Sequence, residues 1–154
     1  MTKASLKENL LQFCEDYVHQ RISRINSQID ELNNSLISET KSSAGDKHET
    51  GRAMLQLERE KLGQQLFEAE KMQPILNRIE TGIASKSNKV VLGCVVETSK
   101  GDYFIGISAG EYRAGKDSIY CISLGTPIGL LLLGKMVGEK FIFNGKNIEV
   151  LRIL

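Results

Sequence analysis

Two carboxylates, Asp46 and Glu49, lie three residues apart in the stretch "SSAGDKHETGRAML" at 42–55. Their spacing is typical of a capping box, in which an acid accepts hydrogen bonds from free N–H groups and a second acid reaches back. The same two side chains also offer the oxygen ligands that a divalent cation such as Mg²⁺ prefers. Spacing alone favours the capping box, and His48 between the two acids is interpreted as an exposed residue without a role.

The residues before this stretch predict one long helix. Apolar side chains recur at intervals of three and four from Leu6 to Leu36, with a one-residue slip near Tyr17, and no Pro or Gly interrupts residues 5–43. This heptad-like spacing is typical of an amphipathic helix that buries one seam. A helix of about 38 residues is about 55 Å long, because each residue adds about 1.5 Å.

The residues after this stretch predict a second helix that returns along the first. A heptad-like series runs from Leu55 to Ala69, and we expect Pro74 to kink or end the helix because it lacks an N–H group. We therefore expect an antiparallel helical coiled-coil hairpin over residues 1–84, with its tip at about 42–50.

The second half of the chain changes to a β-strand pattern. Short β-rich runs ("KVVLGCVVET", "DYFIGIS", "SIYCIS", "KFIFNG" and "IEVLRIL") alternate with turn residues, which predicts a compact, mostly antiparallel sheet. Within "GTPIGLLLLGK", Thr126 is a good N-cap, Pro127 a good first helical residue and Gly134 a good stop, so we expect one short helix. The sequence thus predicts an α+β protein, with a linker at 85–89 and a β-rich domain at 90–154.

Composition limits the classes of function. Of the 154 residues, 41% are apolar and 25% are charged, which is normal for a soluble globular protein, and the net charge is +1. Neither half is basic enough to predict autonomous nucleic-acid binding. No apolar run approaches the roughly 20 residues of a membrane span, and the N-terminus carries no apolar signal-peptide core. We therefore expect a cytoplasmic protein that does not engage a membrane.

The three cysteines, Cys14, Cys94 and Cys121, are odd in number and widely spaced, and no C-x-x-C is present. This pattern argues against a disulfide framework or a zinc site. Cys94 and Cys121 lie in apolar strand-like runs, so we interpret them as inert core thiols.

Two stretches give the chain a resemblance to a known family. The tip "AGDKHETG" is similar to the Gly-Asp-x-x-Glu-Asn tip of the Gre family of bacterial transcript-cleavage factors, with Asp46 and Glu49 on its two acidic positions. The run "ISLGTPIGLLLLGKMVGEKFIF" resembles the C-terminal Ile-Ser-x-x-Ser-Pro run of that family, and "IEVLRIL" resembles its last strand. With the hairpin lengths, the resemblance covers nearly the whole chain.

The resemblance implies a partner and a mechanism. It implies that the β-rich domain is FKBP-like and docks at the rim of the secondary channel of bacterial RNA polymerase, with Thr126 and Pro127 as contact candidates. It implies that the hairpin enters the channel, where Asp46 and Glu49 help hold a Mg²⁺ ion at the polymerase's active centre while water cleaves the 3′ end of backtracked nascent RNA. The chain would then be an accessory factor and not an enzyme, with no cofactor bound alone and no small-molecule substrate. The leucines at 130–133 have two interpretations, a partner-docking ridge together with Pro127 or core packing, and core packing is expected to explain most of them.

Several interpretations stay open at the tip. The basic residues Lys41, Lys47 and Arg52 can contact RNA phosphates or form an ordinary solvated helix surface. Where the family usually continues Asn-Ala-Glu-Tyr, this chain has Thr-Gly-Arg-Ala at 50–53. That difference motivates a second hypothesis, a regulator that binds the secondary channel without stimulating cleavage. An FKBP-like prolyl isomerase or chaperone, which the scarce aromatics disfavour, and a coiled-coil adaptor are further alternatives.

Overall fold

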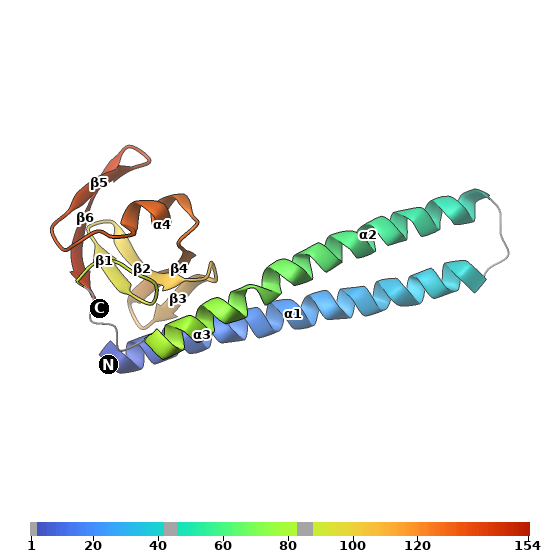
Figure 1. The fold of residues 1–154 in the computed structure, drawn as a ribbon, viewed down its shortest axis with the longest axis horizontal. Helices are drawn as coiled ribbons and strands as arrows, with labels where there is room; N and C mark the ends of the chain where they lie inside the picture. The colour runs from blue at the N-terminus through green and yellow to red at the C-terminus, as the bar shows by residue number, and fades with distance from the viewer. Residues whose placement is uncertain (1–2, 42–45, 83–87) are drawn as a thin grey trace. The chain divides into compact units, whose positions relative to one another are not determined.

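The structure is a computed structural model that describes residues 3–41, 46–82 and 88–154, with side chains described except at 39–41, 46–49 and 80–82 (Figure 1). Three helices come first, and a sheet with one short helix follows, as expected for the α+β class. The helices are α1 (Lys3–Lys41), α2 (Asp46–Glu70), α3 (Met72–Gly82) and α4 (Pro127–Leu132). The strands are β1 (Val95–Thr98), β2 (Gly101–Gly106), β3 (Gly110–Ala114), β4 (Asp117–Ser123), β5 (Lys140–Phe143) and β6 (Lys146–Ile153).

The chain divides into two compact units. One unit combines Met1–Tyr17 with Gln73–Leu154, and the other is Val18–Met72. This division differs from the boundary expected at 85–89, because the beginning of α1 and nearly all of α3 belong to the same unit as the sheet. The linker expected at 85–89 lies mostly outside the described residues.

The unit Val18–Met72 is a helical hairpin made by α1 and α2 (Figure 1). Its core is a cluster in which Ile25 and Ile29 of α1 meet Leu62 and Ala69 of α2. Partly buried side chains extend this seam on both helices: Ile22, Leu32 and Leu66. These positions carry the three-four spacing of the sequence, so the hairpin expected from periodicity is confirmed at its seam.

The return path of the hairpin is interrupted at Lys71. Helix α2 ends at Glu70 and α3 begins at Met72, while the Lys71 N–H donates to the Phe67 carbonyl at 3.2 Å. Pro74 explains the interruption, since a proline ring clashes with the carbonyl four residues earlier, which here is that of Glu70. Pro74 itself is tolerated as the third residue of α3, because the N–H groups of a first helical turn need no partner within the helix.

The six strands form one mixed sheet with the order β3-β4-β2-β1-β6-β5. Four neighbouring pairs are antiparallel, whereas β2 and β4 are parallel, with Asp102 opposite Ile119 and Gly106 opposite Ser123. The expected antiparallel sheet is therefore correct except for this one pair. The strand β3 was not expected; it is an edge strand with the charged sequence "GEYRA" and pairs only with β4.

Both faces of the sheet are covered. The adjacent residues Val95 and Val96 of β1 are both buried, although successive strand residues point to opposite faces. On one face α4 contributes Ile128 and Leu132 to a core with Val96, Ile105, Cys94, Val90, Ile148 and Val150. On the other face α1 and α3 pack, as seen where the Phe13 ring meets Tyr112 edge-on at 5.4 Å. A Cβ atom at Gly106 would approach the Ile79 Cδ1 atom of α3 to 3.0 Å, so α3 lies very close to β2.

Candidate functional site

The acidic pair lies in the first turn of α2. The helix begins at Asp46, so both acids belong to its first four residues. The first four N–H groups of an α-helix have no partner within the helix, and negative charge there is stabilised by the helix dipole. The structure does not describe the side chains of Asp46 and Glu49, nor those of Lys41 and Lys47. The roles expected for these four residues therefore stay predictions.

The four residues after the acids continue the same helix. Helix α2 runs through Gly51 without interruption, although glycine costs a helix interior about 1 kcal/mol relative to alanine. The side chains of Thr50, Arg52 and Ala53 are exposed. Arg52 is thus accessible to solvent, three residues after Glu49 in the sequence.

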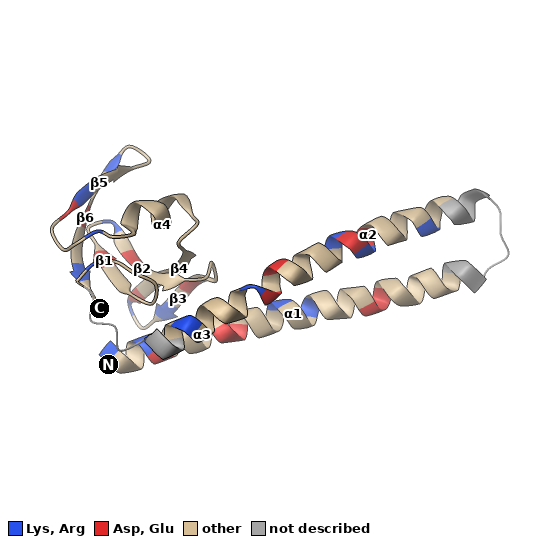
Figure 2. Cartoon of the chain, in the orientation of Figure 1, with Lys and Arg blue, Asp and Glu red and all other residues tan. Residues whose placement is uncertain are grey.

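Charges of both signs alternate along the described parts of α1 and α2 (Figure 2). Within residues 3–38 and 50–79, the ribbon carries no continuous basic stripe of the kind that tracks a nucleic-acid backbone. Among the side chains that the structure describes, no three His, Cys, Asp or Glu residues gather closely enough to hold a metal ion. None of the described helices has the length and apolar character needed to cross a membrane.

The start of α4 has the geometry that the sequence predicts. Thr126 is the N-cap in an extended conformation, and its hydroxyl accepts a hydrogen bond from the Gly129 N–H at 3.1 Å. The same hydroxyl donates to the Ser123 carbonyl at 2.8 Å. Pro127 follows as an exposed first helical residue, and Gly134 ends the segment with a φ of 80°. Thr126 is therefore a structural cap, and Pro127 is the better placed of the two for contact with a partner.

Replacing Thr126 with alanine should lower the free energy of unfolding by about 1 kcal/mol, because both hydrogen bonds of the cap hydroxyl are lost. Urea titrations followed by tyrosine fluorescence would measure the change. Thr126→Ser keeps the hydroxyl and should stay within about 0.3 kcal/mol of the wild type. Equal losses in the two variants would contradict the capping role.

Helix α4 exposes more apolar side chains than the expected core packing of its leucines predicts. Leu132 is fully buried, whereas Leu130 is 63% and Leu133 46% exposed, so core packing explains fewer of these leucines than expected. Met136 and Val137 just beyond the helix are also exposed. Helical spacing could have indicated that Leu130 and Leu133 are exposed. Ile128 and Leu132 are four residues apart and share the buried face, which leaves the other leucines on the opposite side.

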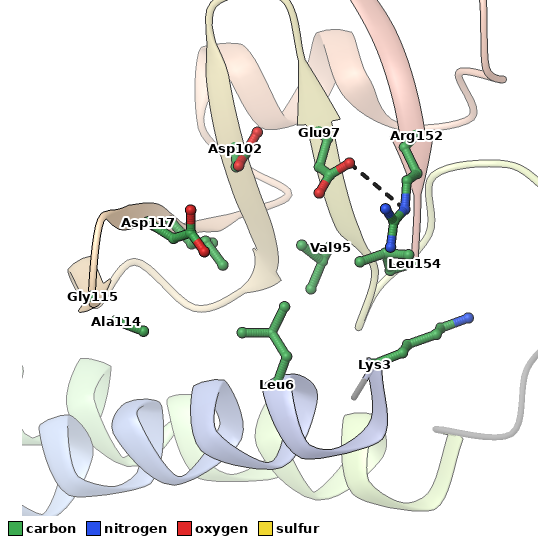
Figure 3. A pocket seen from close by; sticks show the side chains of 11 residues that line it. Lys3, Leu6, Val95, Glu97, Asp102, Ala114, Gly115, Asp117, Arg152 and Leu154 are labelled. Atoms are coloured by element: carbon green, nitrogen blue, oxygen red, sulfur yellow. Dashed lines mark ion pairs between the residues drawn. The ribbon is translucent and has the colours of Figure 1, made fainter. Parts of the chain in front are cut away.

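A cavity of about 430 Å³ lies between the beginning of α1 and the sheet, within one unit (Figure 3). Its lining combines apolar and charged residues: Lys3, Leu6, Val95, Glu97, Asp102, Ala114, Gly115, Asp117, Ile119, Arg152 and Leu154. Glu97 is paired with Arg152 at 3.7 Å, as the dashed line in Figure 3 shows. Asp102 lies opposite Glu97 on the neighbouring strand, so two carboxylates are direct cross-strand neighbours. Burial, reinforced by the negative charge of Glu97, raises the pKa of Asp102 above its usual value.

Replacing Asp102 with asparagine should stabilise the protein at pH 7 by about 0.5 kcal/mol, because like charges directly opposite on neighbouring strands are destabilising. A carboxyl group with a raised pKa in the folded state stabilises most when protonated, and this contribution is lost as the pH rises through the folded-state pKa. The advantage of Asp102→Asn should therefore be small at pH 3 and grow toward pH 7. Urea titrations across this range would measure it, and Asp30→Asn, the same replacement at an exposed position of α1, is the control.

Taken together, the described elements define an α+β protein with a helical hairpin unit and a second unit built on a mixed six-stranded sheet. The chain matches no protein-family model and no curated protein sequence. It is similar to the crystal structure of Thermus aquaticus Gfh1, with 16% sequence identity, a TM-score of 0.33, and coverage of 92% of this chain and 94% of that chain. At this identity and score, the similarity carries no functional conclusion.

Proposed function

We propose that this chain is a Gre-type transcription factor that binds bacterial RNA polymerase, enters its secondary channel with the helical hairpin, and stimulates cleavage of backtracked RNA. The observation that carries the proposal is the order of two sequence features in one chain. An acidic pair at the start of the returning helix comes first, and the "TPIGLLLLGK" run that forms the capped helix α4 follows.

In this proposal the hairpin unit enters the channel, and the unit that contains the sheet binds the surface of the polymerase. The hairpin would carry the acids into the channel, because Asp46 and Glu49 lie at the beginning of α2. The buried seam between α1 and α2 holds the two helices together. The other unit would dock on the polymerase through the exposed side chains at α4, with Pro127, Leu130 and Leu133 as candidates. A channel-entering factor of this kind acts in the cytoplasm and performs no chemistry alone.

Asp46 and Glu49 are the residues that would hold a Mg²⁺ ion together with the polymerase's own acidic residues. The donor chemistry fits, since Mg²⁺ takes carboxylate oxygens, but two carboxylates are too few for an independent site. In the polymerase, the ion would stabilise the attacking and leaving oxygens of RNA cleavage. Lys41, Lys47 and Arg52 would lie near the RNA 3′ end, where positive charge attracts phosphates.

A stalled-complex assay tests the proposal. Bacterial RNA polymerase is halted in a backtracked state on a template with 3′-labelled RNA, and the chain is added with Mg²⁺. Release of short 3′ fragments at a rate that rises with the concentration of the chain supports the proposal. The absence of fragments together with the absence of polymerase binding, measured with a fluorescently labelled chain, rejects it.

A second candidate is a regulator that occupies the channel without stimulating cleavage. The exposed side chain of Arg52 favours it, because a positive charge stands where the family usually has an acid near the metal-directed pair. In this case the chain would bind polymerase and compete with a cleavage factor, yet no RNA fragments would appear. Reversal of the charge by Arg52→Glu would then produce cleavage.

A further inference from the structure

The face of the sheet opposite α4 holds the cavity, which the proposed polymerase contacts do not use. The strand register places its charged lining on this one face. Glu97 lies opposite both Asp102 of β2 and Arg152 of β6, and Asp102 lies opposite Ile119 of β4. Residues that lie opposite one another, or two apart on one strand, point to the same side of a sheet. Asp117, two residues before Ile119, therefore belongs to this face as well.

The charges in this cavity are not balanced. Glu97 is paired with Arg152 at 3.7 Å, which leaves Asp102 and Asp117 as the other two acidic side chains of the lining. No ion pair links either aspartate to a base among the side chains that the structure describes. Lys3 also lines the cavity, but Figure 3 shows its side chain extending away from both aspartates. One end of the cavity therefore carries negative charge that no described base neutralises.

Asp102 and Asp117 are close enough to bind one ligand together. Because Asp102 lies opposite Ile119, Asp117 is one strand across and two residues along, which places the two Cα atoms about 8 Å apart. Figure 3 shows both side chains on the β2 and β4 side of the cavity. Burial, together with the negative charges of Glu97 and Asp117, raises the pKa of Asp102, which agrees with uncompensated charge at this end. A cationic group between the two carboxylates would remove this repulsion.

The apolar part of the lining determines which cation fits. Val95 is 1% and Ile119 4% exposed, and Figure 3 shows the Leu6 side chain pointing from α1 toward the sheet. The volume of about 430 Å³ is typical of small-molecule sites and far exceeds the roughly 30 Å³ of one water molecule. A bare metal ion suits the cavity poorly, since no three acidic, His or Cys residues gather to hold one among the described side chains. An alkyl chain that ends in a cationic group matches both parts of the lining.

We propose that this cavity binds a small primary alkylamine in its protonated form. The ammonium group lies between Asp102 and Asp117 and donates hydrogen bonds to both carboxylates, because an ammonium has three N–H donors. The alkyl chain extends toward Leu6 and Val95 and buries apolar surface against Ile119. Both interactions are needed, since Asp117 is exposed and Asp102 only partly buried, and attraction between exposed charges alone is weak.

A titration with butylamine followed by NMR tests the proposal. The full chain, labelled with ¹⁵N, is titrated with butylamine hydrochloride at pH 7 and constant ionic strength, and the backbone amide signals are recorded. We expect saturable shifts for Val95 and Gly115, which both line the cavity, with a dissociation constant on the order of 1 mM. The signals of Ile25 and Leu62 in the hairpin seam should not move.

Two further probes separate the charge of the ligand from its chain. 1-Butanol has the same alkyl chain without a charge, and ammonium chloride has the charge without the chain. Each should bind at least about tenfold more weakly than butylamine, because one loses the charge-assisted hydrogen bonds and the other loses the burial of the chain. The proposal fails if butylamine causes no saturable shift. It also fails if either probe shifts the same signals at the same concentration as butylamine.

A double replacement tests the two aspartates. Asp102→Asn/Asp117→Asn should weaken butylamine binding by at least about tenfold, because both charges are removed while the side-chain shape is kept. The control Asp30→Asn/Glu31→Gln removes two charges at exposed positions of α1 in the other unit and should bind within about twofold of the wild type. Equal affinities of the two double variants would overturn the proposal. The comparison of the three probes uses the wild-type chain, so it decides the question even if a variant does not fold.

Discussion

Replacing Asp46 with asparagine and Glu49 with glutamine should reduce RNA cleavage in stalled polymerase complexes by at least about 100-fold. The substitutions remove both negative charges that would hold the Mg²⁺ ion, and a metal-assisted displacement depends on charge stabilisation at the attacking and leaving oxygens. Both replacements keep the size of the side chain, and Asn remains a good residue at a helix start, so α2 should form as before. The rate of 3′ fragment release measures the loss.

A matched pair of acids farther along the same helix provides the control. Glu58 and Glu60 are exposed in α2, and the double replacement Glu58→Gln/Glu60→Gln removes the same charge from the hairpin. This control should cleave within about twofold of the wild type, because surface charges distant from the reacting atoms contribute little. Polymerase affinity of both variants should be unchanged. If the variant without the two charges at Asp46 and Glu49 cleaves RNA as fast as the wild type, these residues do not hold the metal ion.

The hairpin shows how far periodicity alone can predict this fold. The spacing of Ile25, Ile29 and Leu62 identifies a buried seam, because the seam of each helix packs on the other. Periodicity identifies a buried face but not what covers it. Leu10 and Cys14 continue the apolar pattern of α1 and are fully buried, yet they belong to the unit that contains the sheet. For this reason the boundary between the units could not be predicted from the apolar pattern.

The apolar strands of the sheet could be predicted from the sequence. The strand β3 could not, because hydrogen bonding to β4 and not an apolar pattern defines it. β3 is charged and lies at an edge, so its residues carry neither the alternation nor the β-branched composition that predicts a strand. The parallel pairing of β2 with β4 depends on which strands meet in space, and the local sequence of a strand does not contain that information. The short helix α4 was predictable because Thr126, Pro127 and Gly134 act locally.

Replacing Gly129 with alanine should lower the free energy of unfolding by about 3 kcal/mol. A Cβ atom at this buried position would lie 2.3 Å from the Ser123 carbonyl oxygen, 2.9 Å from the Thr126 hydroxyl and 3.1 Å from the Leu124 Cα. Two of these neighbours are backbone atoms, so relief requires α4 to move away from the turn that precedes it. The Ser123 carbonyl accepts hydrogen bonds from both the N–H and the hydroxyl of Thr126, so its displacement disrupts the cap as well. Overpacking and loss of a cap together account for a cost of this size.

Gly125→Ala is the matched control, because it makes the same change four residues earlier. Gly125 is exposed, and the nearest atom to its Cβ position is the Ser123 Oγ at 3.9 Å, which is ordinary contact. Its free energy of unfolding should stay within about 0.5 kcal/mol of the wild type in urea titrations. If α4 is the docking element, Gly129→Ala should also weaken polymerase binding, while Gly125→Ala should bind normally. If Gly129→Ala keeps the stability of the wild type, α4 can shift without cost and the predicted overpacking is wrong. If Gly129→Ala loses stability but binds polymerase normally, the docking surface lies elsewhere in the chain.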